Sequence, residues 1–541
     1  MASTSLVGAQ TLQTLYSFSG IYRLGSWNLT LGPDGNFYGT TELGGITNSS
    51  YIGGMGTVFK VTTNGMLTTL VSFNYSLNGA YPEAGLTLGN DGNFYGTTSQ
   101  GGIIDENQNI PYGMGTVFQI TTNGTLTMLV SFNGTNGANP QAALTLGNDG
   151  NFYGTTEGGG RSGYDYGNGY GTVFKVTTKG KLTTLVYFNP NGERPEAGLT
   201  LGNDGNFYGT TKWGGIGDGV VFKVTTNGTL TWLASFWDMF PSGLTLGNDG
   251  NFYGTTEMGG FYDNGTVFKV TTNGMLTTLV YFKGTNGANP EAGLTLGNDG
   301  NFYGTTEGGG IGSDGGSFSG NGTVFMVTTN GMLTTLVYFN GTNGAYPAAG
   351  LTLGPDGNFY GSTEDGGSSS NGTVFRLLLP PDITVQPQSQ TNNAGATVTF
   401  LVSATSLIPL SYQWQKSGTN LVNGGDISGA NSNALTVTGI SDSDAASYSV
   451  IVSNANFSIT NYATLTVIDP PKMVLQFLAG YPVLSLNGML SNNFVVQYST
   501  NLAGSNWINL LSLTNLSASP YLFLDPAGVE QPARFYRAFM Q

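Results

Sequence analysis

Residues 144–156 read LTLGNDGNFYGTT, and this run or a close variant of it returns throughout the first 380 residues. Its octet DGNFYGTT begins at seven aspartates, which are Asp34, Asp91, Asp149, Asp204, Asp249, Asp299 and Asp356. Successive copies are separated by 45 to 58 residues. Self-similarity at such a period is the signature of a repeat architecture, in which each copy is one supersecondary unit. The sequence therefore predicts seven copies of one small unit.

The copy at residues 142–188 predicts four short antiparallel strands. They are expected at 142–147, 151–156, 171–177 and 181–188, where apolar and β-branched residues stand between turns rich in Asn, Asp and Gly. In most units the last two strands are joined by Asn-Gly, which is a strong signal for a tight hairpin. Four such strands in one repeat are typical of one blade of a β-propeller.

The first and last units complement each other. A segment similar to LTTLVSF ends six of the units, but its seventh copy stands at residues 11–18, before the first octet. The last unit stops at residues 372–377 without such a strand. Pairing these two segments would complete the last unit and remove open sheet edges. The predicted fold class is all-β: a seven-bladed β-propeller closed by the N-terminal strand, followed by an immunoglobulin-like sandwich and a second small β-sandwich.

Two Pro-Pro pairs set the repeats apart from two further segments. In the first segment, Trp414 and the run DAASYSV at 444–450 resemble the core Trp and the tyrosine corner of immunoglobulin domains. Val402 and Val450 stand where that fold carries its disulfide cysteines. The predicted domains are a signal-peptide remnant or disordered start at 1–10, the propeller at 11–379, the immunoglobulin-like domain at 380–468 and a C-terminal β-sandwich module at 469–541.

The octet, the GTVFKV segment and the LTTLVSF segment together resemble the GloVer tandem-repeat family, a choice-of-anchor group of bacterial secreted or surface proteins. The resemblance covers about 380 of the 541 residues. It implies export and a propeller-like array, and it brings no catalytic residues, because the family has no settled biochemical activity. The last segment also looks like a β-sandwich module that often ends secreted proteins of planctomycete and verrucomicrobial type.

The composition excludes several classes of function. The chain has no Cys and no His, so disulfides, thiolate or imidazole metal sites and histidine-dependent triads are all excluded. Its net charge of −15 disfavours nucleic acids and anionic membranes as partners. No apolar run approaches the ~20 residues of a membrane span. We therefore expect a protein that is not an enzyme and that has no metal, cofactor, nucleic-acid partner or membrane span.

One edge of each predicted blade varies far more than the other. The variable connections lie at 43–55, 100–114, 157–170, 212–218, 257–264, 307–321 and 364–371. Variable loops on a constant scaffold usually form the binding face of a repeat protein. Aromatic rings beside carboxylates suit saccharide rings, and packing of the loops on one another is an equal alternative. The candidate binding residues are Tyr51, Tyr112, Tyr164, Tyr166, Tyr170, Trp213, Trp237, Phe261 and Tyr262.

The repeated charged residues receive structural interpretations. The octet aspartates are attributed to turn formation, in which a carboxylate accepts hydrogen bonds from the local backbone. Lys60, Lys175, Lys223 and Lys269 share one position of the third strand, and we expect them to extend into solvent, since Met326 replaces them in another unit.

Three glutamates precede the first strand of their units and are candidates for the mouth of a channel. They are Glu83, Glu196 and Glu291. Other units carry Gln141, Ser242 and Ala348 at the same position, which argues against a shared catalytic or cation-binding ring.

The leading hypothesis is a non-catalytic extracellular or cell-surface recognition and scaffold protein, whose variable loops bind a glycan or a surface protein. The alternative is a self-assembling subunit of an extracellular filament or layer, in which residues 11–18 complete the sheet of another copy. A lesser alternative is a carboxylate-dependent glycosidase or polysaccharide lyase, which needs two suitably spaced acids.

Overall fold

The computed structural model describes residues 11–19, 28–45, 53–75, 77–103, 113–160, 169–215, 217–310, 319–468, 471–487, 493–503, 506–516, 518–530 and 533–540. These residues form β-strands and two short 3-10 turns, and they contain no α-helix. The chain divides into two compact units, of which one ends at Leu379 and the other begins at Pro380. Each unit is described by itself.

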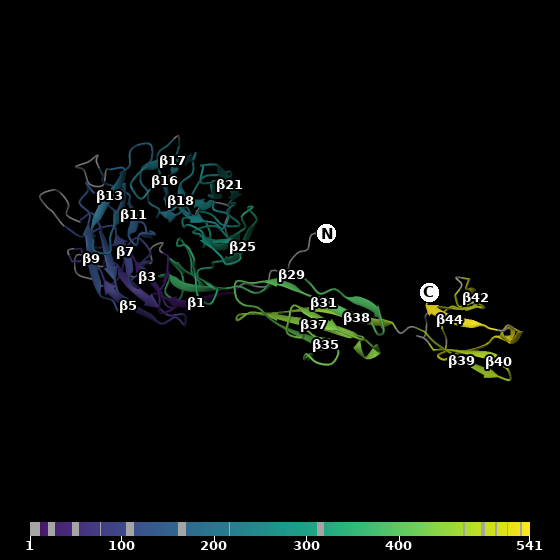
Figure 1. Ribbon diagram of the computed structural model, residues 1–541. Coiled ribbons are helices and arrows are strands. Elements are labelled where there is room, and N and C mark those ends of the chain that lie inside the picture. The colour runs from purple at the N-terminus through teal and green to yellow at the C-terminus, as the bar shows by residue number, and fades with distance from the viewer. Residues whose placement is uncertain are drawn as a thin grey trace. The chain divides into compact units, whose positions relative to one another are not determined.

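The unit that ends at Leu379 contains seven four-stranded sheets, here called sheets 1 to 7 (Figure 1). Sheet 1 has β2 (Thr30–Leu31), β3 (Phe37–Thr41), β4 (Thr57–Val61) and β5 (Leu67–Ser72). Sheet 2 has β6 (Thr87–Leu88), β7 (Phe94–Thr98), β8 (Thr116–Ile120) and β9 (Leu126–Ser131). Sheet 3 has β10 (Thr145–Leu146), β11 (Phe152–Thr156), β12 (Thr172–Val176) and β13 (Leu182–Tyr187).

Sheets 4 to 7 repeat this order. Sheet 4 has β14 (Thr200–Leu201), β15 (Phe207–Thr211), β16 (Val220–Val224) and β17 (Leu230–Ser235). Sheet 5 has β18 (Pro241–Leu246), β19 (Phe252–Thr256), β20 (Thr266–Val270) and β21 (Leu276–Tyr281). Sheet 6 has β22 (Thr295–Leu296), β23 (Phe302–Thr306), β24 (Thr323–Val327) and β25 (Leu333–Tyr338). Sheet 7 has β26 (Thr352–Leu353), β27 (Phe359–Thr363), β28 (Thr373–Leu378) and β1 (Thr11–Ser17).

Sheet 7 is completed by the N-terminal strand. β1 runs antiparallel to β28, with Thr11 opposite Leu378 and Ser17 opposite Thr373. Directly after β1, the Phe18 amide donates a hydrogen bond of 3.0 Å to the Gly372 carbonyl. The predicted pairing of residues 11–18 with the incomplete last repeat is therefore confirmed.

The prediction of a seven-bladed β-propeller is corrected by the sheet topology. The strands form separate four-stranded sheets, and none of these sheets is closed: each ladder of hydrogen bonds ends at an edge strand. A seven-bladed propeller is not supported, and the fold is described as an all-β series of sheets. The physical reason is that a sequence period fixes the strand order within one sheet, whereas it does not fix the arrangement of the sheets.

Aromatic rings and threonine hydroxyls join neighbouring sheets. The Tyr95 and Phe152 rings, from sheets 2 and 3, are stacked with centroids 4.0 Å apart, and both side chains are fully buried. A contact of the same kind joins Tyr360 of sheet 7 to Phe37 of sheet 1. The Thr145 hydroxyl donates to the Leu199 carbonyl of sheet 4 at 2.5 Å. The expected burial of the Phe-Tyr pair of the octet is confirmed.

The unit that begins at Pro380 contains an immunoglobulin-like part. Its strands are β29 (Asp382–Val385), β30 (Gln390–Asn393), β31 (Val398–Leu401), β32 (Ser403–Thr405), β33 (Ser411–Lys416), β34 (Thr419–Asn420), β35 (Ile427–Ser428), β36 (Ala434–Val437), β37 (Ala446–Ser453) and β38 (Ser458–Ile468), with the 3-10 turn η2 (Asp442–Asp444). Val402, Trp414 and Val450 are fully buried in one cluster. The Tyr448 hydroxyl donates to the Asp444 carbonyl at 3.1 Å. These contacts confirm the expected core Trp, apolar pair and tyrosine corner.

The C-terminal residues form two three-stranded sheets. The first sheet contains β39 (Lys472–Leu478), β40 (Tyr481–Asn487) and β43 (Tyr521–Leu524), and the second contains β41 (Phe494–Ser499), β42 (Ile508–Leu513) and β44 (Phe535–Met540). The 3-10 turn η3 (Pro526–Glu530) precedes β44. Leu484 and Leu486 of the first sheet share a buried cluster with Phe494 and Val496 of the second.

Candidate functional site

One polar cluster fixes the turn between the first two strands of each repeat. In sheet 3 the Asn151 amide donates to Asp149 Oδ1 at 3.1 Å, and the Tyr153 hydroxyl donates to Asp149 Oδ2 at 2.9 Å. Lys175 Nζ lies 2.6 Å from the same oxygen. Burial acts to raise the pKa of the Asp149 carboxyl, but the hydrogen bonds from Lys175, Asn151 and Tyr153 hold that pKa well below its usual range. This edge of the sheet is thus rigid and constant.

The lysines of the third strands are therefore not simply solvent-facing, and this expectation is corrected. Lys60, Lys175, Lys223 and Lys269 each form an ion pair with the octet aspartate of their own sheet, at 2.5 to 2.8 Å. Their ammonium groups also lie 5.3 to 5.7 Å from the centroid of the octet Tyr ring. The interpretation of the aspartates as turn residues is confirmed, with the ion pair as a second role.

The connection from sheet 4 to sheet 5 departs from the pattern of the other repeats. Only four residues, Trp237-Asp238-Met239-Phe240, stand between Phe236 and Pro241, whereas seven stand between Phe132 and Pro140. Asp238 has a positive φ of 56°. This shortened connection brings an exposed Trp to a place where longer connections carry Asn, Gly and Thr.

The neighbouring loop of sheet 5, residues 257–264, is held by its own hydrogen bonds. The Gly259 amide donates to Asp263 Oδ1 at 2.9 Å. The Glu257 amide donates to the Phe240 carbonyl at 2.8 Å, which joins this loop to the shortened connection. A Cβ on Gly259 would lie 2.0 Å from the Asp238 carbonyl oxygen, so only glycine permits this close approach. The two loops form one fixed surface.

A hollow of about 680 Å³ lies between these loops and the end of β21. We call it the aromatic hollow, and its lining consists of Trp237, Asp238, Met239, Gly260, Phe261, Tyr262, Tyr281 and Lys283. Trp237 is 71% exposed and Phe261 is 80% exposed, although both are large apolar side chains. The Phe261 and Tyr262 rings meet edge to face at 4.9 Å. The volume lies within the range of about 300–1,000 Å³ that is usual for ligand pockets.

The structure brings together three of the predicted binding residues, Trp237, Phe261 and Tyr262. Trp213 lies beside them in the fold, with its ring 4.9 Å from that of Phe240, but it does not line the aromatic hollow. Tyr170 is partly buried and packs against the core of sheets 3 and 4, so it serves packing. Four further candidates lie outside the described residues: Tyr51, Tyr112, Tyr164 and Tyr166.

The sequence analysis missed Tyr281 and Lys283. The signal was present in the register of the repeats. The residue after the last Phe of the fourth strand is Asn in four repeats, namely Asn74, Asn133, Asn189 and Asn340. At this position the two repeats that build the aromatic hollow carry Trp237 and Lys283 instead.

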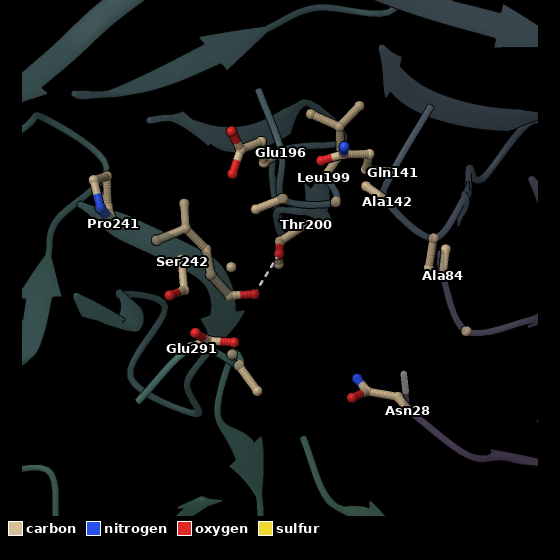
Figure 2. Close-up of a pocket in the computed structure, with 18 of the residues that line it drawn as sticks. Asn28, Ala84, Gln141, Ala142, Glu196, Leu199, Thr200, Pro241, Ser242 and Glu291 are labelled. Atoms are coloured by element: carbon tan, nitrogen blue, oxygen red, sulfur yellow. Dashed lines mark hydrogen bonds between the residues drawn. The ribbon is translucent and has the colours of Figure 1, made fainter. Parts of the chain in front are cut away.

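A second hollow, of about 480 Å³, is lined by segments at the first strands of all seven sheets (Figure 2). We call it the multi-sheet cavity. Figure 2 shows Glu196, Ser242 and Glu291 around it, together with the hydrogen bond of 2.5 Å from the Thr200 hydroxyl to the Leu244 carbonyl. Of the three predicted channel glutamates, Glu196 and Glu291 line the multi-sheet cavity, and Glu83 is not among its lining residues.

The carboxylates near this cavity differ in their surroundings. Lys212 Nζ lies 3.0 Å from Glu196 and 3.3 Å from Glu257. Burial raises the pKa of the Glu83 carboxyl to about 7, although Ser99 donates a hydrogen bond to it. Burial and the neighbouring Glu307 carboxylate also raise the pKa of Glu291. Within the described ranges, no three acidic side chains are grouped so that they could hold a metal ion.

The comparisons with known proteins assign the repeats to a family. The pattern of the Gloeobacter/Verrucomicrobia repeat matches residues 4–164, 104–318 and 239–405, and that of the immunoglobulin domain matches residues 380–454. Together the repeat matches span more than half of the chain. No curated protein matches the chain. In its described part, the protein has no helix that is long and apolar enough to cross a membrane.

Solved structures that match the chain include immunoglobulin domains of titin. The titin M4 domain is 23% identical, with a TM-score of 0.16, over 16% of this chain and 95% of its own. Titin M10, in a complex with obscurin-like 1, is 26% identical, with a TM-score of 0.16, over 17% of this chain and 97% of its own. By the repeats that fill most of its length, this chain belongs to the Gloeobacter/Verrucomicrobia repeat family.

Proposed function

We propose that this protein is a non-catalytic extracellular recognition protein that binds a saccharide in the aromatic hollow. The chain is a repeat-rich all-β protein with an immunoglobulin-like domain, a combination typical of extracellular or structural roles. The observation that carries the proposal is the exposure of Trp237 and Phe261 on the surface of one hollow.

The exposed rings are unusual in a sheet whose other aromatic residues are buried. Phe252 and Tyr253 of sheet 5 are 1% and 0% exposed. Clustered exposed apolar groups commonly mark interaction sites, and single exposed ones do not. An aromatic ring offers a flat apolar face, which suits the C–H face of a sugar ring, while polar atoms at the rim suit its hydroxyls.

The aromatic hollow is also preorganised for binding. Asp263 closes its own loop through the Gly259 amide, and the Glu257 amide joins that loop to the Phe240 carbonyl. A surface that is already ordered loses less conformational entropy when a ligand binds. These contacts favour recognition by a rigid site over induced closure.

A glycan array screened with the full chain tests this proposal, followed by titration of the best ligand with three variants. We expect Trp237→Ala and Phe261→Ala to weaken binding by about tenfold or more each. Met275→Ala is the matched control, because Met275 belongs to the same sheet, is 64% exposed and lies in the turn between β20 and β21. Absence of binding to every saccharide, or equal loss in all three variants, would contradict the proposal.

A second candidate function, self-assembly by strand addition, is favoured by the pairing of β1 with β28. These strands are separated by almost the whole repeat array, and the Arg376 guanidinium donates a hydrogen bond to the Gln13 side chain at 2.6 Å. The same ladder would form if β1 came from a second copy, since its hydrogen bonds do not depend on which chain supplies the strand.

Sizing at increasing protein concentration tests this second candidate. Self-assembly predicts oligomers or filaments that are lost when residues 11–18 are deleted and restored when a peptide of those residues is covalently fused after Leu379. A monomer at all concentrations would contradict it.

A further inference from the structure

The charges in the aromatic hollow differ from those of the rest of the repeat array. Trp237 and Lys283 occupy one equivalent position in successive repeats, and both line the aromatic hollow. Asp238 is the other charged residue of that lining. A hydrophobic wall therefore carries one ammonium and one carboxylate.

Lys283 is available to a ligand. The ion pairs within the described ranges include the third-strand lysines and Lys212, and none of them involves Lys283. Its ammonium lies 5.8 Å from the centroid of the Tyr262 ring, at the aromatic lining. Its backbone amide donates to Asn286 Oδ1 at 2.8 Å, which fixes the position of the main chain.

The surroundings make this ammonium selective. The whole chain has a net charge of −15, so an acidic polymer is repelled over most of the surface. A contact between an ammonium and a carboxylate is charge-assisted and stronger than a neutral hydrogen bond. A partly apolar wall strengthens such a contact further, because it lowers the local dielectric constant.

We infer that the aromatic hollow binds a sugar acid, namely a uronate residue of an acidic polysaccharide. This inference rests on the proposed saccharide binding and adds the class of saccharide. Lys283 pairs with the carboxylate, Asp238 accepts hydrogen bonds from hydroxyl groups, and Trp237 and Phe261 cover the face of the ring. A neutral sugar would use the same rings and leave Lys283 without a partner.

Titration with short oligomers of galacturonate and of mannuronate, and with the methyl esters of both, tests the inference. Each ester keeps the ring and the hydroxyls and loses the charge. We expect one acid to bind about tenfold more tightly than its own ester, because a hydrogen bond to a charged group is worth this much. Lys283→Gln should remove that preference and leave the affinity for the ester unchanged, while Trp237→Ala should weaken binding of both forms.

The outcomes separate the inference from the proposed function. If neither acid is preferred over its ester, or if the preference persists in Lys283→Gln, the uronate assignment is overturned while binding of a neutral saccharide still supports the proposed function. If no saccharide binds at all, both fail. A preference lost in Lys283→Gln and weakened by 1 M salt supports the assignment, because salt screens exposed charges.

Discussion

Asp149 illustrates how one residue serves both the turn and the sheet. Its carboxylate accepts hydrogen bonds from Asn151 and Tyr153 and forms an ion pair with Lys175. The turn role follows from the run Asn-Asp-Gly-Asn, because Asp favours such turns. The ion pair does not follow from the sequence alone, since Lys175 is 26 residues away and becomes a neighbour only through the strand register.

This cluster predicts a loss of stability in acid. The Asp149 pKa is lower in the folded protein than in the unfolded chain, so its stabilisation is present above the unfolded pKa of about 4 and is lost as the pH falls toward the folded value. Lys175→Met should lower the free energy of unfolding at pH 7 by about 0.2–1 kcal/mol, the range of exposed ion pairs. Urea denaturation at pH 7 and pH 3 measures it.

The difference between wild type and Lys175→Met should shrink at pH 3, where protonation of Asp149 removes the pair. Sheet 6 provides an internal control, because Met326 already stands opposite Tyr303 at this position and the sheet forms. A difference that grows in acid would contradict the assignment of the stabilisation to this ion pair.

The second strand of each sheet explains why the octet contains glycine. In β11 a Cβ on Gly154 would lie 2.6 Å from the Phe174 ring and 2.8 Å from the Leu144 side chain. Gly39 and Gly304 have the same close neighbour, a Phe of the third strand. The constraint is therefore packing against an aromatic ring.

We predict that Gly154→Ala destabilises the repeat array by about 1–3 kcal/mol, the usual cost of overpacking a core. Thermal unfolding of the full chain measures the change. Gly150→Ala separates packing from backbone strain, because Gly150 has a φ of 73° and no atom within 4 Å of an added Cβ. A shift for Gly154→Ala no larger than experimental error would contradict the packing argument.

The strands show how far sequence patterns reach. The second, third and fourth strands of each repeat and the pairing of residues 11–18 follow from the motifs and are found in the structure. The first strand is shorter than expected, since 142–147 contains only the two-residue β10. In sheet 5 the corresponding β18 extends over Pro241–Leu246. Single-repeat patterns do not reveal such differences, which depend on neighbouring connections.

At the scale of the whole molecule, the repeat count and the immunoglobulin-like part were predictable, and the propeller arrangement was not supported. The number of sheets follows from counting motifs. Their arrangement depends on side-chain contacts between sheets, such as that of Tyr95 with Phe152, which a period does not encode.

The candidate site was predicted in part for the same reason. Exposed aromatic residues in variable loops suggested Trp237, Phe261 and Tyr262, which do meet in the aromatic hollow. Lys283 and Tyr281 come from the end of a strand and its successor, and they reach the aromatic hollow only because the connection before sheet 5 is short. Comparing equivalent positions across repeats would have identified Lys283.

The most direct measurement of the central claim is a crystal structure of the full chain with the tightest-binding saccharide from the array. Saccharide binding in the aromatic hollow predicts a sugar ring lying flat over Trp237 or Phe261, with its polar groups toward Asp238 and Lys283. A sugar bound elsewhere, for example beside Glu196 in the multi-sheet cavity, with the rings of the aromatic hollow untouched, would contradict the claim.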